Sequence, residues 1–189
     1  MSRLTSKLFV ISGPSGAGKG TLVARVRKEL PGLGLTVSAT TRSPRPGEVD
    51  GVNYHFLTVE DFERRVAAGE FVEWANVFGN CYGTLVSEVE SKLAAGTSLI
   101  LEIDVQGALQ VKERFPEAVL IFIKPPSDEV LRERLIGRGT ETPEVVEVRL
   151  ATAQRELALA DRYDEVLIND DLDEATTELV RIIKKHERN

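Results

Sequence analysis

Four short, predominantly apolar runs stand out along the chain. They lie at Leu8–Ser12, Ser98–Ile103, Val119–Lys124 and Glu165–Asn169. Runs of this kind predict strands that are buried on both faces, as the strands of a parallel sheet are. The residues Thr36–Thr40 are predicted to add a fifth strand to the same sheet.

Segments with apolar residues at helical spacing separate most of these runs. The first carries Leu22, Val26 and Leu30 on one face, and Pro31-Gly32 follows as a stop signal. The predicted helices occupy Thr21–Leu30, Val86–Ala95, Gly107–Phe115, Asp128–Ile136 and Leu172–His186. Strands that alternate with helices predict an α/β fold, a parallel sheet flanked by helices, whose ligands bind beyond the carboxyl ends of the strands.

Two segments interrupt this alternation. Residues 37–87 contain turn signals such as Ser43-Pro44-Arg45-Pro46-Gly47 and most of the aromatic residues, which predicts a small inserted lobe. Residues 138–160 follow a glycine-rich start and then read as a long helix with basic side chains, which predicts a mobile helical lid. The rest of the chain, 1–36, 88–137 and 161–189, is predicted to form the core of one domain.

The composition excludes several classes of function. With 24 Lys and Arg against 30 Asp and Glu, the formal charge is −6. A general duplex-binding protein needs a broad basic face, so no nucleic acid partner is expected. The apolar run near the N-terminus is too short for a signal peptide or a membrane span, so no membrane association is expected. The single cysteine, Cys81, cannot form an internal disulfide, and a cytoplasmic location is therefore expected.

A glycine-rich loop follows the first predicted strand and leads directly into the first predicted helix. It reads Gly13-Pro14-Ser15-Gly16-Ala17-Gly18-Lys19-Gly20-Thr21. Glycines let backbone N–H groups turn toward phosphate oxygens, the helix N-terminus adds partial positive charge, and a lysine at this spacing reaches the β and γ phosphates. A dinucleotide site fits less well, because the glycine spacing differs and no carboxylate ends the second strand. The loop therefore predicts an ATP site.

One position of the loop departs from the general pattern. Gly20 stands where a serine or threonine usually binds Mg²⁺, and the hydroxyl comes one residue later, on Thr21. Mg²⁺ keeps several waters and is often held mainly by substrate phosphates. We therefore expect Mg²⁺ to be bound together with ATP, and its protein ligand stays open.

Further motifs follow the phosphate loop in a specific order. They are Val37-Ser38-Ala39-Thr40-Thr41-Arg42-Ser43-Pro44-Arg45-Pro46-Gly47-Glu48, Asn53-Tyr54-His55-Phe56, Glu70-Phe71-Val72-Glu73-Trp74, Gly79-Asn80-Cys81-Tyr82-Gly83-Thr84 and Leu101-Glu102-Ile103-Asp104-Val105-Gln106-Gly107. Taken with the phosphate loop, this succession resembles guanylate kinase over nearly the whole chain. The resemblance implies a P-loop fold with a GMP-binding lobe and a lid. It also implies transfer of the γ-phosphoryl group of ATP to GMP, and to dGMP, in purine nucleotide metabolism.

The resemblance also implies roles for individual residues. The phosphate of GMP would be held by Arg42, Arg45, Tyr54 and Tyr82. The guanine pocket would be lined by Ser38, Glu73, Thr84 and Asp104, with Glu102 close by. On the ATP side, Asn169 would approach the adenine, Arg134 lies on the helix that leads to the lid, and Arg138 and Arg149 resemble lid arginines. The catalytic residues would then be Lys19, Arg42, Arg138 and Arg149.

Physical reasoning supports this assignment. Two arginines and two phenolic hydroxyls suit a phosphate dianion, and a buried carboxylate such as Glu73 accepts hydrogen bonds from guanine in a way that adenine cannot match. Two other interpretations stay open at this point. One is a binding module with the same fold and no catalysis, and the other is a kinase for a different nucleoside monophosphate. The sequence leaves the oligomeric state open.

Overall fold

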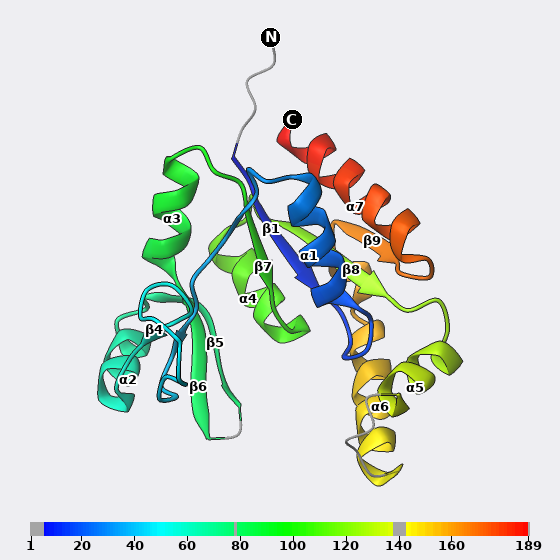
Figure 1. Cartoon of the computed structure of the whole chain (residues 1–189), viewed down its shortest axis with the longest axis horizontal. Coiled ribbons are helices and arrows are strands. Elements are labelled where there is room, and N and C mark those ends of the chain that lie inside the picture. The colour runs from blue at the N-terminus through cyan, green and yellow to red at the C-terminus, as the bar shows by residue number, and fades with distance from the viewer. Residues whose placement is uncertain (1–5, 78, 138–142, 189) are drawn as a thin grey trace.

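A parallel sheet forms the centre of the molecule, with its strands in the order β2-β7-β1-β8-β9 (Figure 1). These strands are β2 (Gly34–Leu35), β7 (Leu99–Glu102), β1 (Leu8–Ser12), β8 (Val119–Lys124) and β9 (Glu165–Ile168). The structure is a computed structural model, and it describes residues 6–77, 79–137 and 143–188. The predicted α/β class with a parallel sheet flanked by helices is confirmed.

Helices cover both faces of this sheet, which explains why β1 is apolar from Leu8 to Ile11. Phe9 and Ile11 pack against α1 (Lys19–Glu29) and α7 (Leu172–Glu187) on one face. Leu8 and Val10 pack on the other face, against residues of α3 (Val86–Ala94) and α4 (Val105–Arg114). All four side chains are at most 3% exposed. Since successive side chains of a strand point to opposite faces, burial on both sides requires an unbroken apolar run.

A second, smaller sheet lies beside the first and has the order β4-β3-β6-β5. Its strands are β4 (His55–Phe56), β3 (Ala39–Thr40), β6 (Asn80–Leu85) and β5 (Phe71–Val77). A separate apolar cluster holds it together, in which Phe62 stacks on Phe71 with ring centroids 4.3 Å apart. We call this unit the small sheet. It is built entirely from residues between 39 and 85.

The prediction of a fifth parallel strand at Thr36–Thr40 is wrong in position. The edge strand of the parallel sheet is Gly34–Leu35, which pairs with Leu99 and Ile100 of β7. Ala39 and Thr40 belong instead to the small sheet, where they pair with β4 and β6. Residues 34–40 therefore supply one strand to each of the two sheets. Hydrophobic periodicity gives no signal for the point at which the chain passes from one sheet to the other.

The helix α2 (Val59–Ala67) was not predicted from the sequence. The features in the sequence that favour this helix are confined to its N-terminus. Thr58 accepts a hydrogen bond from the amide of Asp61, and Glu60 and Asp61 place negative charge in the first turn. Only Phe62 is fully buried. Because the residues around it are rich in turn signals, this nine-residue helix, which covers the small sheet, was not recognised in the sequence pattern.

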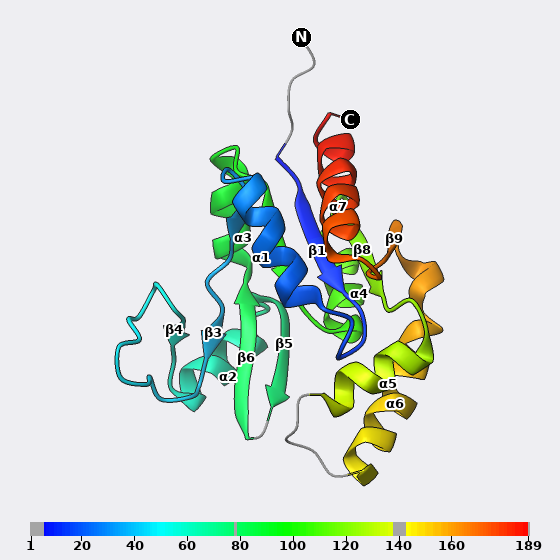
Figure 2. The same cartoon turned by 45° about the vertical axis from the view of Figure 1, so that its right-hand side comes forward.

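The helices α5 (Asp128–Ile136) and α6 (Pro143–Leu157) pack on each other away from the small sheet. Figures 1 and 2 show them on one side of the carboxyl end of β1, with the small sheet on the other side. A short 3₁₀ turn, η1 (Ala160–Arg162), then leads into β9. Within the described ranges, we find no helix with the length and apolar character needed to cross a bilayer.

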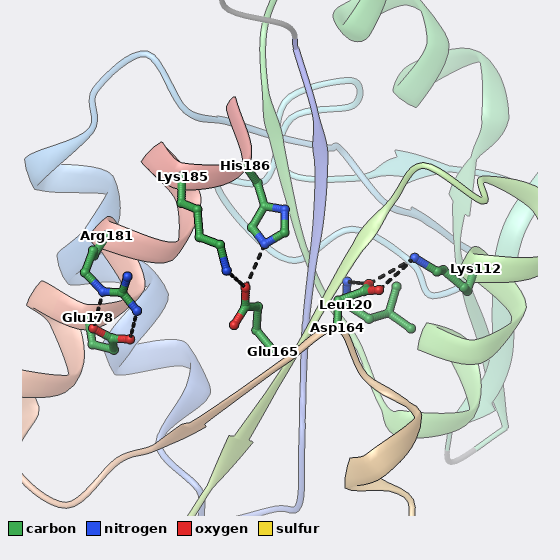
Figure 3. A network of polar contacts seen from close by, with 8 residues as sticks. All are labelled: Lys112, Leu120, Asp164, Glu165, Glu178, Arg181, Lys185 and His186. Atoms are coloured by element: carbon green, nitrogen blue, oxygen red, sulfur yellow. Dashed lines mark hydrogen bonds and ion pairs between the residues drawn. The ribbon is translucent and has the colours of Figure 1, made fainter. Parts of the chain in front are cut away.

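Ion pairs fix the start of β9 between its neighbours, as Figure 3 shows. Asp164 accepts hydrogen bonds from the amide of Leu120 at 2.8 Å and from Lys112 Nζ at 2.9 Å. The next residue, Glu165, accepts from Lys185 at 2.7 Å and contacts His186 Nε2 at 2.8 Å. Adjacent carboxylates thus tie β9 to β8 and α4 on one side and to α7 on the other.

We expect the Glu165 contacts to make stability depend on pH. Hydrogen bonds from Lys185 and then His186 lower the pKa of Glu165. A carboxylate with a depressed folded-state pKa stabilises the protein above its unfolded pKa, and that contribution disappears as the pH falls through the folded pKa. Glu165→Gln should therefore lower the Tm at neutral pH by about 3 °C, for about 1 kcal/mol lost.

Thermal melts of the two proteins between neutral and strongly acidic pH would test this expectation. The difference in Tm should shrink as the pH falls. Glu178→Gln is the control for a more exposed ion pair (Figure 3). The hydrogen bond from Arg181 also lowers the pKa of Glu178, so the same trend with pH is expected but with a smaller change in Tm. A constant difference at every pH would contradict the role given to the charge of Glu165.

Candidate functional site

The phosphate loop spans Gly13 to Gly18 between β1 and α1. Gly13, Gly16 and Gly18 all have positive φ values, 140°, 89° and 86°. A Cβ at Gly13 would collide with the carbonyl oxygen of Ile123 on the neighbouring strand β8. Glycine is needed there for two reasons, the backbone conformation and the close approach of β8. The helix α1 begins at Lys19, two residues before its predicted start, because Gly18 in the left-handed region is its N-cap.

Lys19 lies over this loop. Its Nζ donates hydrogen bonds to the carbonyl oxygens of Gly13 at 2.6 Å and of Pro14 at 3.0 Å. These contacts place the ammonium group at the mouth of the loop, where the N-terminus of α1 also directs its partial positive charge.

A cavity of about 520 Å³ opens in front of the loop. Its lining combines the phosphate loop, the segment after β7 and one residue of α6: Gly13, Ser15, Gly16, Gly18, Lys19, Gly20, Thr21, Glu102, Ile103, Asp104 and Glu156. Burial raises the pKa of Glu102, and the charge of Lys19 opposes that effect. The Glu102 carboxylate lies beside the first turn of α1, where a Cβ on Gly20 would stand 3.5 and 3.7 Å from its two oxygens. The predicted place of Glu102 close to guanine stays a prediction.

A cluster of basic and aromatic side chains lies on the small sheet and the loop that follows β3. The guanidinium carbon of Arg42 is 5.4 Å from the ring centroid of Tyr54, and the rings of Tyr54 and Tyr82 meet edge to face at 6.1 Å. Arg45 lies on the same loop and is exposed. The structure thus brings three of the four predicted phosphate ligands, Arg42, Tyr54 and Tyr82, into one cluster.

A second group of polar residues lies where β5 and β6 meet the start of α4. The hydroxyl of Thr84, which is 1% exposed, donates to Glu73 Oε1 at 2.8 Å. Asp104 caps α4 by accepting from the amide of Gly107 at 2.7 Å. A Cβ at Gly107 would lie 3.5 Å from Glu73 Oε2 and 3.4 Å from Asp104 Oδ1, so both carboxylates border the same small space. Burial raises the pKa of Glu73, and Asp104 raises it further.

Ser38 immediately precedes β3, and its carbonyl oxygen accepts from the amide of His55 at 2.9 Å. This bond joins the entry of β3 to β4. The role predicted for the Ser38 side chain in a guanine pocket stays a prediction.

Residues near α5 and α6 approach the phosphate loop from the other side. Arg149 on α6 donates to Ser15 Oγ at 3.4 Å. Arg134 on α5 donates to the carbonyl oxygen of Asn169 at 3.0 Å, and its other terminal nitrogen is buried without a hydrogen-bond partner in the part of the chain that the structure describes. Arg138, the other predicted lid arginine, lies outside the described residues.

Asn169 supports the loop itself. Its side-chain amide, on a residue that is 5% exposed, donates to the carbonyl oxygen of Ala17 at 2.8 Å. A Cβ at Gly18 would collide with the same amide nitrogen. The predicted approach of Asn169 to adenine stays a prediction, and the contact with the phosphate loop is an additional one that the sequence did not indicate.

Two acidic residues in the site were missed by the sequence analysis. Glu48 binds Arg42, and this contact lowers the pKa of the Glu48 carboxyl. Glu156 lines the cavity and stands seven residues after Arg149, on the same face of α6. That spacing was visible in the sequence. The Glu48 contact depends on a turn whose direction the sequence pattern did not give.

Comparisons with known proteins agree on one family. The family model described as guanylate kinase matches residues 5–186 of this chain. A guanylate kinase of Gloeobacter violaceus is 55% identical over 178 residues, which cover 94% of this chain and 87% of that protein. A guanylate kinase of Fusobacterium nucleatum is 51% identical over 177 residues, which cover 94% and 95%. The crystal structure of a guanylate kinase from Anaplasma phagocytophilum superposes with a TM-score of 0.73 at 33% identity, covering 98% of this chain and 88% of that one.

Proposed function

The chain belongs to the guanylate kinase family, and from this premise we propose how its own residues divide the work of moving the γ-phosphoryl group of ATP to GMP. The chain is an ATP:GMP phosphotransferase. The main support for separate ATP and GMP subsites is the position of Asp104. It lines the cavity of the phosphate loop, and it also borders the space beside Glu73. Donor and acceptor subsites therefore adjoin at one residue.

The donor side belongs to the phosphate loop. The loop amides and Lys19 bind the β and γ phosphates, because Lys19 already lies at the loop mouth. Arg134 and Asn169 are hydrogen-bonded to each other, and Asn169 is also bonded to Ala17 of the loop. In this proposal they border the adenosine part of ATP.

The acceptor side belongs to the small sheet. Arg42, Arg45, Tyr54 and Tyr82 hold the phosphate of GMP, since guanidinium and phenol groups both donate hydrogen bonds to anionic oxygens. Glu73, Thr84, Asp104 and Ser38 hold the guanine. Glu73 Oε1 is engaged by Thr84, which leaves its other oxygen directed toward the space that it shares with Asp104.

The chemical step needs alignment and charge neutralisation more than a base. The attacking oxygen of GMP is already anionic, so the residues that matter are those that hold both phosphates in line. Lys19 and Arg42 hold the two reacting groups from opposite sides, and Arg149 approaches from α6.

Guanylate kinases use ATP and in general need Mg²⁺, and the residues here suit that ion. The Glu102 carboxylate faces the position where a hydroxyl side chain would stand in place of Gly20, and Asp104 lines the same cavity. Carboxylate oxygens are donors that Mg²⁺ prefers, directly or through its waters. Glu102 and Asp104 would hold the ion that arrives with ATP, and the ion would neutralise charge on the β and γ phosphates.

The helices α5 and α6 act as a lid in this proposal. Leu131 and Leu135 of α5 pack on Val146 and Ala153 of α6, so the two helices form one packed unit. Arg149 lies between Val146 and Ala153 along α6, and it reaches the phosphate loop through Ser15. Closure of this unit would exclude water from the transferring group, which limits hydrolysis of ATP.

Arg149→Ala should lower kcat by about a hundredfold while changing the KM for GMP much less, because a lid arginine acts on charge that develops during transfer. Steady-state kinetics with GMP varied at saturating ATP would measure both. Arg155→Ala is the matched control, since the Arg155 hydrogen bonds stay within its own helix. An equal loss in kcat and in GMP affinity would contradict the role given to the lid.

The acceptor assignment is tested by ADP formation from ATP and Mg²⁺ with GMP, dGMP, AMP, CMP, UMP or dTMP. We expect strong activity with GMP and activity with dGMP. Preference for another base would overturn the guanine pocket and keep the phosphate loop. Absence of activity with every acceptor would favour a binding module. We also propose a cytoplasmic location for this reaction, which agrees with a chain that has one cysteine.

A further inference from the structure

Arg42 is held by a carboxylate that none of the roles above includes. Its Nη2 donates to both carboxylate oxygens of Glu48, at 2.9 and 3.0 Å, and its Nη1 donates to the carbonyl oxygen of Ser43 at 2.7 Å. The side chains of Arg42 and Glu48 are only 15% and 19% exposed. The guanidinium group also faces the rings of Tyr54 and Phe56 at 5.4 and 5.8 Å. Arg42 is therefore fixed along its edge and over its face.

A tight turn brings Glu48 to this position. The amide of Glu48 donates to the carbonyl oxygen of Arg45 at 3.0 Å, which closes a four-residue turn. Pro46 occupies the second position and Gly47 the third, with φ at 87°. Proline followed by a glycine with positive φ is the pattern of a type II turn, and it folds the chain back so that residue 48 meets residue 42.

The same carboxylate also holds the second arginine of the loop. The amide of Arg45 donates to Glu48 Oε2 at 2.7 Å. Glu48 is thus bonded to the side chain of one arginine and to the backbone of the other. The start of the loop is fixed separately, because Thr40 Oγ1 accepts from the amide of Arg42 at 3.2 Å and donates to the backbone carbonyl oxygen of Cys81 at 3.0 Å.

Two opposing effects follow from a carboxylate at this place. Its negative charge offsets part of the attraction between Arg42 and a phosphate dianion, and its hydrogen bonds hold Arg42 in one orientation. The bonds to Glu48 and Ser43 use only part of the five N–H donors of a guanidinium group, so a phosphate can bind beside Glu48 without displacing it. The arginine side chain is long and has many rotamers. When other contacts already hold it in one of them, it loses less conformational freedom on binding a phosphate. We therefore expect the gain from a fixed orientation to exceed the loss from the charge of Glu48.

We propose that Glu48 is a positioning residue for the acceptor phosphate, which orders Arg42 and Arg45 before GMP binds. This inference rests on the proposed role of Arg42 in holding the phosphate of GMP. Glu48 does not touch the substrate in this role; it acts through the two arginines.

Glu48→Gln tests the charge, because glutamine has the same length and keeps one oxygen as acceptor. We expect the KM for GMP to rise about tenfold, while the KM for ATP and the Tm stay close to those of the wild type. Glu48→Ala removes the bond to the Arg45 amide as well, so the KM for GMP should rise further. Glu60→Gln is the matched control, since Glu60 is an exposed carboxylate on α2, the helix that covers the small sheet.

A double-mutant cycle separates positioning from a general structural effect. GMP affinity, measured by equilibrium binding, should fall on Arg42→Ala, and Glu48→Gln should cause no further fall in that background. A KM for GMP that is unchanged or lower in Glu48→Gln, or an additive loss in the double variant, would overturn the role of Glu48 alone. Unchanged GMP binding in Arg42→Ala would overturn the proposed phosphate subsite and the role of Glu48 with it.

Discussion

Replacing Lys19 by alanine is expected to reduce kcat/KM by about a thousandfold, because a fixed positive charge at the transferring phosphoryl group is among the largest single contributions to such reactions. Lys19 is placed for that role by its bonds to the carbonyl oxygens of Gly13 and Pro14. Its side chain spans the loop mouth and faces the cavity that also contains Glu102. An ADP-release assay with ATP, Mg²⁺ and GMP would measure the loss.

Lys28→Ala serves as the control for this variant, because Lys28 is exposed near the other end of α1. Its activity and Tm should match those of the wild type. The backbone of the phosphate loop should keep its shape in Lys19→Ala, since Asn169 still bonds to Ala17 and Gly13 still packs against β8. Activity of Lys19→Ala within tenfold of the wild type would contradict the assignment of the donor site.

Glu73→Gln should lower kcat/KM for GMP by about a hundredfold and narrow the preference for GMP over AMP. The reason lies in the bond from Thr84 to Glu73 Oε1. In the variant, the amide oxygen would keep the bond from Thr84, and the amide NH₂ would then face the N–H groups of guanine. The amide NH₂ and the guanine N–H groups are all donors, so none of them would find an acceptor in the other. Adenine presents fewer donors at this edge, so its binding should be weakened less.

The pH dependence gives a second measurement on the same residue. Burial raises the pKa of Glu73, with a smaller contribution from Asp104, so the free enzyme takes up a proton there at higher pH than an exposed glutamate would. Only the ionised carboxylate accepts both guanine N–H groups. The value of kcat/KM for GMP should therefore fall as the pH falls through this raised pKa, and Glu73→Gln should lose that dependence.

Glu63→Gln, on the exposed side of α2, is the control for both measurements. A Glu73→Gln enzyme that keeps the wild-type preference for GMP over AMP would show that the guanine is recognised by other residues.

The central part of the fold was predictable because its signals are local and strong. β1 is buried on both faces, which requires the apolar run Leu8 to Ile11, and the glycines that follow the strand have backbone conformations that other residues rarely adopt. The Gly34–Leu35 edge strand was misplaced for a different reason. Its two residues take their conformation from pairing with β7, a partner far away in the sequence, and their own pattern carries almost no signal.

The candidate site was predictable only in part, and mainly through resemblance. Nothing in the spacing of Arg42, Tyr54 and Tyr82 places them together; the pairing of β3 with β6 does so, by setting Thr40 opposite Tyr82. The same limit explains why Glu48 was overlooked. A Pro-Gly turn indicates that the chain reverses, and it does not indicate which side chain the reversal will meet.

The bond between Asn169 and Ala17 joins residues that are 152 positions apart. The shape of the phosphate loop therefore depends on a residue that follows β9 as well as on the glycines of the loop itself. Loss of β9 and α7 would remove that support from a loop whose own sequence is intact. The motif alone is thus not a complete binding site, because its shape is a property of the whole domain.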